Sequence, residues 1–288
     1  MATKRMRILA GLKGMAGVLL GSLLLLPGGM QAQTADEQEA RQREELLGPR
    51  PDTSSLSILR FVTEGDYPPF NYFDEDGQLI GFNVDIARAV CRELEINCEI
   101  NAVAWDSIVP LLLNREADAA IASIAITPDS VETLSFTNRY YETPARFVAR
   151  FGHDIAGVTP DELEGRSIGV MAGTAHEAFL RDFYEDVEIK TFKSADEMRA
   201  ALKSGEVDLI FADVVSLMFW VNGQQSEGCC VLLPGGFNEP RYFGEGGSIA
   251  VARGNLQLIE ILNYGLAKVR ISGRYDEIFL RYFPSSFY

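Results

Sequence analysis

The acid whose position most suggests a binding role, Asp213, ends the predicted buried strand VDLIFAD at residues 207–213. The carboxyl ends of strands are where open α/β sheets bind ligands. A carboxylate there can pair with an ammonium group, although an acid at a strand end is also a common helix N-cap, in this chain for VVSLMFW.

Donor groups and flat surfaces complement this acid. Gly173-Thr174 follows the predicted strand SIGVMAG and opens a helix, where unpaired N–H groups and the helix dipole favour a carboxylate. Tyr67, in YPPF, and Trp105, ahead of a short helix, offer rigid faces to a ligand stem or a cation. YPPF can also be a simple turn, and Trp105 a packing residue.

Signals for catalysis or for a metal site are weak. The chain has two histidines, His153 and His176, which stand 23 residues apart. It has no GxSxG nucleophile turn, no Walker A loop and no GxGxxG dinucleotide loop. We therefore expect a binding protein with no enzymatic activity, no metal and no cofactor.

Strands and helices alternate from Leu56 onward, which is typical of an α/β fold with two lobes and a cleft between them. The predicted strands cover residues 56–63, 98–103, 118–126, 167–173, 187–192, 207–213 and 247–253. The predicted helix starts are Asn83, Asp106, Thr127-Pro128, Thr159-Pro160, Thr174 and Ser194, with two C-terminal helices over 256–270 and 275–282.

Residues 1–32 have the order of a secretory signal peptide. MATKRMR is basic, an apolar stretch follows, and Pro27-Gly28-Gly29 ends it. A membrane anchor is the alternative, but the uninterrupted apolar run is shorter than the ~20 residues of a spanning helix. Residues 33–55 are polar and predict a mobile leader. We expect a periplasmic location.

Charge excludes one class of partner. The whole chain carries a net charge of −15, and residues 1–32 hold four basic residues and no acid, which leaves −19 for the remainder. Such a field repels phosphates, so the chain is not a nucleic-acid binder. A hydrophobic content of 47% excludes wholesale disorder.

The four cysteines, Cys91, Cys98, Cys229 and Cys230, allow three pairings, and spacing does not choose among them. An oxidising compartment would permit a clip between the helix that holds Cys91 and the strand that begins at Cys98. Cys229-Cys230 can be a vicinal disulfide, two free thiols or an intermolecular bridge.

An ordered set of motifs resembles the family 3 extracytoplasmic solute-binding proteins, the periplasmic receptors of polar amino-acid ABC importers. The resemblance covers Leu56 to Phe283 and is similar in detail to histidine- and lysine/arginine/ornithine-binding members. It implies a Cys91–Cys98 disulfide. The motifs that carry it are GDYPPFNYF, GQLIGFNVDIARAV, DSIVPLLLNREADAAIASIAITPD, LSFTNRYY, GVMAGT, VDLIFAD and SGRYDEIFLRYF.

The resemblance implies a ligand site shared by two lobes. In the first lobe, Tyr67 would stack on the ligand and Glu64 would meet its side chain. Trp105 would form an apolar or aromatic wall, and Ser123 would turn a backbone carbonyl toward the ligand ammonium.

In the second lobe, the resemblance assigns Thr174 and Ala175 to the helix start that offers N–H groups to the ligand carboxylate. Asp213 matches the acid that pairs with the α-ammonium.

One position departs from the family. Amino-acid-binding members have an Arg three residues after the Thr that follows the buried strand, and it grips the α-carboxylate. Here the segment is Thr127-Pro128-Asp129-Ser130, and Ser130 cannot make a bidentate contact. Either the Gly173-Thr174 helix start and a relocated cation hold the carboxylate, or the ligand lacks one. The candidate replacements, which can equally be surface or hinge residues, are Arg139, Arg146 and Arg241.

The resemblance implies a type II periplasmic-binding-protein fold, with two α/β lobes joined by a two-segment hinge. We expect the first lobe over 56–147 and 250–288, the second over 148–249, and crossings near 145–150 and 247–251. The implied function is that of a monomeric receptor. It would capture a small polar solute, an amino acid or a derivative, by hinge closure and deliver it to an ABC transporter permease.

Two alternatives remain. An exported enzyme on the same fold, of the cyclohexadienyl dehydratase type, would use Glu64 as its acid. A ligand-sensing periplasmic partner would act in trans.

Overall fold

The computed structural model describes residues 47–54 and 56–287. The predicted signal peptide, residues 1–32, and the predicted leader up to residue 46 lie outside these residues.

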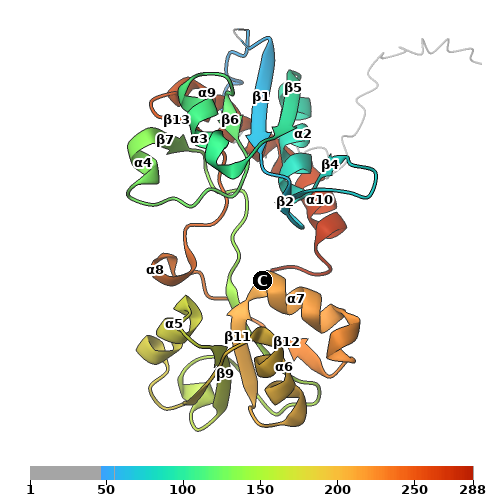
Figure 1. The fold of residues 1–288 in the computed structure, drawn as a ribbon, viewed down its shortest axis with the longest axis vertical. Helices are drawn as coiled ribbons and strands as arrows, with labels where there is room; N and C mark the ends of the chain where they lie inside the picture. Colours follow the sequence, from blue (N-terminus) through green and yellow to red (C-terminus); the bar gives the residue numbers. More distant parts are fainter. Residues whose placement is uncertain (1–46, 55, 288) are drawn as a thin grey trace, which may run out of the picture.

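Two five-stranded sheets form two lobes along the long axis of the molecule (Figure 1). The first sheet has the order β5 (Asn97–Ala102), β1 (Ile58–Thr63), β6 (Ala119–Ala120), β13 (Ala250–Ala252) and β7 (Leu134–Phe136). The second has the order β10 (Glu188–Phe192), β9 (Ser167–Met171), β11 (Leu209–Asp213), β8 (Ala145–Arg150) and β12 (Cys230–Leu232). This mixed α/β architecture confirms the predicted fold class.

Each sheet buries both faces, because residues of alternating direction along its strands pack under different helices. In β1, Leu59 and Phe61 pack in the same cluster as residues of α2, α9 and α10, whereas Val62 packs in the cluster of α3. The bounds of these helices are α2 (Phe82–Leu94), α3 (Trp105–Leu113), α9 (Leu256–Ile271) and α10 (Arg274–Tyr282).

The second lobe repeats this layering. In β8, Phe147 packs in the cluster of α5, and Val148 packs with residues of α6 and α7. The helices of this lobe are α5 (Ala175–Phe183), α6 (Ala195–Ser204), α7 (Val214–Asn222) and the short α8 (Pro240–Phe243). The remaining described elements are α4 (Ser130–Thr133), the 3₁₀ turns η1 (Asp161–Leu163) and η2 (Gln224–Ser226), and the hairpin strands β2 (Asp66–Tyr67), β3 (Asn71–Phe73) and β4 (Leu79–Ile80).

Three predicted helix caps are wrong. The N-cap of α4 is Asp129, not Thr127, although Thr127 Oγ1 accepts from Ser130 N–H (3.1 Å). Helix α2 begins at Phe82, and its N-cap is Gly81, whose φ of 131° brings the backbone so close to Phe70 that a Cβ would lie 2.3 Å from the Phe70 carbonyl. The N–H groups of Phe82 and Asn83 donate to the carbonyls of Pro69 and Phe70 (2.9 and 2.8 Å). Because the preceding loop supplies these acceptors, the Asn83 side chain is buried instead. Asp106 lies inside the first turn of α3, which Ala104 precedes.

The predicted strand over 118–126 is shorter than expected. Residues 121–124 are largely buried, as predicted, but the ladder of β6 covers only Ala119–Ala120. Ser123 has a φ of 54°, in the left-handed region, so the chain cannot continue as an extended strand. The strand predicted over 247–253 is also shorter than expected, since β13 begins only at Ala250. Gly247 pairs instead with Tyr140 and Tyr141, in the segment that leaves the first lobe.

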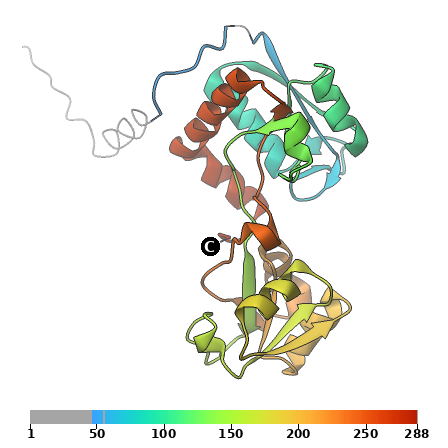
Figure 2. The ribbon, with the colours of Figure 1, turned by 90° about the vertical axis from the view of Figure 1, so that its left-hand side faces the viewer.

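The lobes are connected by residues 137–144 and 244–249, which run side by side (Figure 2). Tyr140 N–H donates to the Gly247 carbonyl and Gly247 N–H to the Tyr141 carbonyl, each at 2.9 Å. The expected crossing at 145–150 is wrong in detail, because those residues are already β8 of the second sheet. The lobe boundaries predicted within 145–150 and at 249/250 stay predictions.

The C-terminal segment adds a further contact beside the hinge. Phe287 is buried and packs against Phe279 and Phe283, at ring distances of 4.7 Å. Its carbonyl accepts from Nη1 of Arg146 (2.6 Å), and the Leu233 carbonyl accepts from Nε and Nη2 of the same guanidinium. Arg146 of the second lobe therefore holds the end of the chain that returns from the first.

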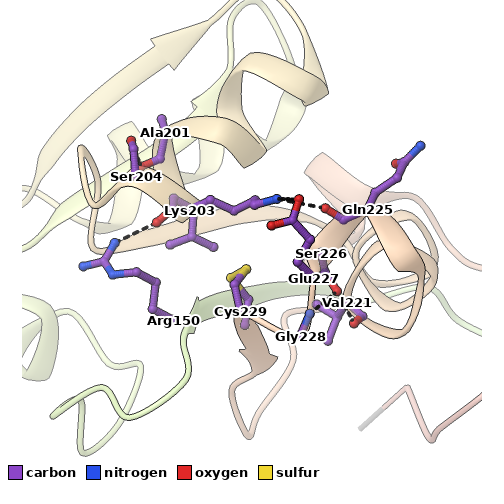
Figure 3. The surroundings of a disulfide bond; sticks show 12 residues. Arg150, Ala201, Lys203, Ser204, Val221, Gln225, Ser226, Glu227, Gly228 and Cys229 are labelled. Atoms are coloured by element: carbon purple, nitrogen blue, oxygen red, sulfur yellow. Dashed lines mark hydrogen bonds and ion pairs between the residues drawn. A yellow bond between two sulfur atoms is a disulfide. The ribbon is translucent and has the colours of Figure 1, made fainter.

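The four cysteines form two disulfides, one at the implied pairing and one at the pair whose state was left open. Cys91–Cys98 joins the end of α2 to β5, which confirms the implied pairing. Cys229–Cys230 is a vicinal disulfide, one of the three alternatives left open. It lies between α6 and the turn around Glu227, where Lys203 pairs with Glu227 (2.9 Å; Figure 3).

Replacing Arg146 by Ala tests the C-terminal contact. The buried carbonyls of Leu233 and Phe287 would lose their donors, so we expect the free energy of unfolding to fall by about 2–4 kcal/mol. Arg241→Ala, which removes an exposed ion pair with Glu239, should cost less than about 1 kcal/mol. Urea unfolding measures both, and equal losses would contradict a structural role for Arg146.

Candidate functional site

The predicted first-lobe residues gather at one edge of the first sheet. Glu64 directly follows β1, and β1 is hydrogen-bonded on both sides at this point: Val103 N–H donates to the Thr63 carbonyl (2.8 Å) and Ile121 N–H to the Val62 carbonyl (3.0 Å). Trp105 follows β5, which pairs with β1 on one side, and Ser123 follows β6, which pairs with β1 on the other. Parallel pairing thus places Glu64 between the segments that carry the other two.

The second-lobe residues lie at the corresponding edge of the second sheet. β9 and β11 are parallel neighbours; Thr174 caps the helix that follows β9, and Asp213 ends β11. The carboxyl ends of β1 and β11 point toward each other across the hinge (Figure 1). The structure therefore brings the two predicted half-sites to facing edges.

A stack of aromatic rings links the loop after β1 to the hinge. The Tyr67 ring stacks on Phe70 with centroids 5.1 Å apart, and Phe70 stacks on Tyr141 at 4.9 Å. Burial raises the pKa of Tyr67, and the negative charges of Asp213 and Glu64 raise it further. Burial likewise raises the pKa of Tyr141. The pKa of Tyr67 thus responds to the charge of an acid from each lobe.

Asp213 serves its own helix and still faces this cluster. Its Oδ1 accepts from the N–H groups of Val215 (2.9 Å) and Ser216 (3.2 Å), so the expected N-cap role is present. Burial raises the pKa of the carboxyl, while these backbone bonds and the hydroxyl of Thr143 act in the opposite direction. A cation placed against Asp213 would offset the cost of burying this charge.

A buried polar network fixes Ser123. Nδ2 of Asn83 donates to Oδ1 of Asn71 (2.7 Å) and to Oγ of Ser123 (3.1 Å), and the Tyr140 hydroxyl donates to Oδ1 of Asn83 (2.6 Å). The Tyr141 hydroxyl donates to the same Ser123 oxygen (2.6 Å). Sequence reasoning assigned Asn83 to a cap and gave no role to Tyr141. The motif LSFTNRYY, quoted only as a resemblance, was the available signal for the tyrosines.

Tyr141 owes its place to a glycine of the other hinge segment. A Cβ at Gly247 would lie 1.9 Å from Cε1 of Tyr141, so a larger residue there would displace the ring. The same tyrosine lines a pocket of about 490 Å³ with Arg270, Phe279 and Phe287. That pocket lies between the hinge and the C-terminal helices, and Asp213 does not line it.

Ser130 is committed within its own turn. Its hydroxyl donates to the Ala125 carbonyl (2.9 Å) and accepts from Thr127 N–H (2.9 Å). Trp105 is half exposed and lines a separate pocket of about 240 Å³ with Asp106, Ile108, Val109 and Ile124. Among the described aromatic rings, Trp105 has no ring partner. The structure thus leaves these two residues apart from the aromatic stack.

The start of α5 holds a carboxylate of the chain itself. Thr174 Oγ1 accepts from Glu177 N–H (3.3 Å) and donates to the Met171 carbonyl (2.8 Å). Oε2 of Glu177 accepts from Gly173 N–H (2.7 Å), and its other oxygen accepts from Arg181. The Gly173 N–H lowers the pKa of Glu177. Ala175 is exposed at the first helical position, where N–H groups have no intrahelical partner.

The three arginines considered as replacement anchors have partners elsewhere. Arg139 pairs with Glu142 (3.0 Å) and Glu245 (3.5 Å). Arg241 pairs with Glu239 (3.1 Å). Arg146 donates to carbonyls beside the hinge.

His176 follows Ala175 and is neutral at pH 7. It packs between Phe211 and Phe243, with ring centroids 5.7 and 5.1 Å away, and burial lowers its pKa to about 4. It therefore brings no positive charge to the start of α5.

Residues 47–54 and 56–287 contain no helix with the length and apolarity to span a membrane. Within the same residues, no three His, Cys, Asp or Glu side chains gather as metal ligands would.

Comparisons with known proteins agree on one family. Residues 59–285 match the bacterial extracellular solute-binding proteins, family 3. The putative ABC transporter arginine-binding protein 2 of Escherichia coli is 33% identical over 230 residues, which cover 80% of this chain and 92% of that protein. The L-arginine-binding protein of Pseudomonas aeruginosa is 33% identical over 233 residues, 80% of this chain and 89% of that protein.

Solved structures show the same fold. The unliganded, open L-cystine solute receptor of Neisseria gonorrhoeae has a TM-score of 0.67 at 18% identity, over 78% of this chain and 92% of that one. The open substrate-binding domain 2 of Lactococcus lactis GlnP has a TM-score of 0.63 at 22% identity, over 83% of this chain and all of that one. The fold is that of a type II periplasmic binding protein.

The buried histidine predicts a pH dependence of stability. The folded-state pKa of about 4 lies below the unfolded value near 6.5, so the unfolded state binds more protons between these values. Stability is therefore lost as pH falls from 6.5 to 4, by at most about 3 kcal/mol from this group. Urea midpoints at pH 7 and 4.5 should differ less in His176→Phe than in the wild type. His153→Phe alters an exposed histidine and should keep the wild-type difference; equal behaviour of the two variants would contradict the assignment.

Proposed function

The chain belongs to family 3 of the bacterial extracellular solute-binding proteins, and from this membership we propose that the solute it receives carries an ammonium or guanidinium group. As a member, it is a solute-binding receptor of the kind that serves ABC transporters. The relatives named as arginine-binding proteins support a cationic ligand of the amino-acid class.

One observation carries the proposal: Glu64 and Asp213 lie at the carboxyl ends of β1 and β11, at facing edges of the two sheets, with the Tyr67–Phe70–Tyr141 ring stack beside Glu64. A ligand ammonium would pair with Asp213, and the Tyr67 ring would contact the ligand stem or a second cation. Ser123 would contribute its carbonyl, and Glu64 would meet the ligand side chain. Thr174 and Ala175 would border the site from the α5 start. Trp105 and Ser130, which lie apart from the aromatic stack, would border it from the first lobe.

Closure about the two hinge segments would bring the facing edges together around the ligand. Bound ligand stabilises the closed state only through contacts with both lobes, which Asp213 and Glu64 provide. We propose that the closed receptor, a monomer, delivers the ligand to the permease of an ABC transporter. The relatives named periplasmic and the predicted signal peptide at residues 1–32 support a periplasmic location.

We propose that the protein binds without catalysis. The two relatives that are 33% identical to this chain are both named as arginine-binding proteins. Glu64, the acid that a dehydratase would need, has its pKa raised by burial and by the neighbouring Asp66, which suits a proton donor, so catalysis is tested directly. Formation of product from prephenate or arogenate by the purified protein would contradict this part of the proposal.

Asp213→Asn tests the role of the second-lobe acid. Asn can retain the N-cap of α7 while removing the charge, so folding should persist. For cationic ligands detected by thermal shift and calorimetry, we expect affinity to fall by at least about 30-fold, equivalent to 2 kcal/mol. Binding should also weaken on acidification, starting at a higher pH than for an ordinary aspartate, because the pKa of Asp213 is raised.

Asp196→Asn is the matched control, since it removes the same charge from an exposed position of the same lobe. Its affinity should stay within a factor of two of the wild type. Absence of any shift with L-arginine, L-lysine, L-ornithine and their decarboxylated counterparts at millimolar concentration would overturn the cationic assignment.

A further inference from the structure

We propose, on the basis of the function above, that the preferred ligand is a cationic amine without an α-carboxylate, such as a diamine or a guanidino-amine. At the facing edges, the Ser130 and Thr174 hydroxyls and the Gly173 N–H are committed to partners within the chain, whereas acids and aromatic rings are left for the ligand.

The charges that act on the site residues are negative. Besides burial, the negative charges of Asp213 and Glu64 raise the pKa of Tyr67, and the charge of Asp213 also raises the pKa of Tyr141. Asp66 acts on Glu64 with the same sign. A second ammonium or a guanidinium would be attracted to this field, whereas a carboxylate would be repelled by it.

Groups that could receive a carboxylate already have partners in the chain. The Ser130 hydroxyl is bonded to Ala125 and Thr127. The Thr174 hydroxyl is bonded to Met171 and Glu177. Gly173 N–H, at the α5 start, donates to the Glu177 carboxylate. A ligand carboxylate that bound the Gly173 N–H would have to displace an anion that is already neutralised by Arg181 at 2.7 Å.

Two of the positive side chains considered for these edges bring no free charge. Arg139 is held by Glu142 and Glu245, and His176 is neutral. Lys193 directly follows β10, the neighbour of β9, and is exposed. Together with the first N–H groups of α5, Lys193 could still hold a carboxylate, so the test includes it.

A carboxylate desolvated without a partner costs more free energy than one left in water. The decarboxylated counterpart of each cationic amino acid keeps both positive groups and lacks only this cost. The two compounds of each pair therefore form a matched probe of one group.

The experiment is calorimetry on the purified protein with three pairs: agmatine and L-arginine, cadaverine and L-lysine, putrescine and L-ornithine. We expect the amine to bind at least about 10-fold more tightly than the amino acid in the best-bound pair. L-arginine methyl ester, which keeps the α-ammonium but has no carboxylate charge, should follow agmatine.

Ser130→Arg should raise the affinity for the amino acid of that pair by about 10-fold or more and lower the preference for the amine, because it supplies a guanidinium at the first-lobe edge. Asp129→Arg places the same side chain one residue away and should change both affinities alike. Melting curves of each variant without ligand show that it is folded.

Tighter binding of the amino acid in every pair would overturn the inference and leave the proposed function standing. The same holds if Lys193→Ala loses affinity for the amino acids but keeps its affinity for the amines. Absence of binding by both compounds of all pairs would instead overturn the proposed function, and the inference with it.

Discussion

The carboxyl ends of β1 and β11 lie at facing edges of the two sheets. Within each sheet, parallel pairing brings the carboxyl ends of neighbouring strands to that same edge. Parallel pairing aligns the ends of β1, β5 and β6 at one edge, and those of β9 and β11 at the other. Glu64 and Asp213 therefore face the same region, although 149 residues separate them. The backbone groups beyond each strand end would be unpaired, so helices, caps and loop carbonyls lie at these edges, which is where open α/β sheets bind ligands.

The hinge depends on close approaches that few residues permit. Tyr141 lies against Gly247 with no space for a Cβ, and its hydroxyl holds Ser123. Movement of the hinge segment that contains Gly247 would therefore shift Tyr141, and through its hydroxyl Ser123, at the first-lobe edge. Arg146 restrains the opposite side, since its guanidinium holds the carbonyl of Phe287. The proposed ligand contacts and the hinge contacts would thus share residues, which is what coupling between binding and closure requires.

The acids at the facing edges support the proposal of a cationic ligand. Asp213 remains partly buried because Val215, Ser216 and Thr143 support its ionised form, yet burial outweighs them and raises its pKa. The site thus carries an electrostatic cost in the absence of ligand, which a bound ammonium would offset. The replacement of the family's carboxylate-gripping Arg by Ser130 fits this balance, because a guanidinium there would add the opposite charge.

The sequence by itself determined the alternation of strands and helices, the fold class, the Asp213 N-cap and the family, because these depend on periodicity and on ordered local motifs. The placement of Asn83 was decided only by tertiary structure: carbonyls of Pro69 and Phe70 cap α2 and turn that side chain to a buried network. The same holds for Glu177, which occupies the α5 start, and for Tyr141, which links the hinge to Ser123. Each of these roles depends on which partner a polar group finds in space, and sequence spacing carries no record of that choice.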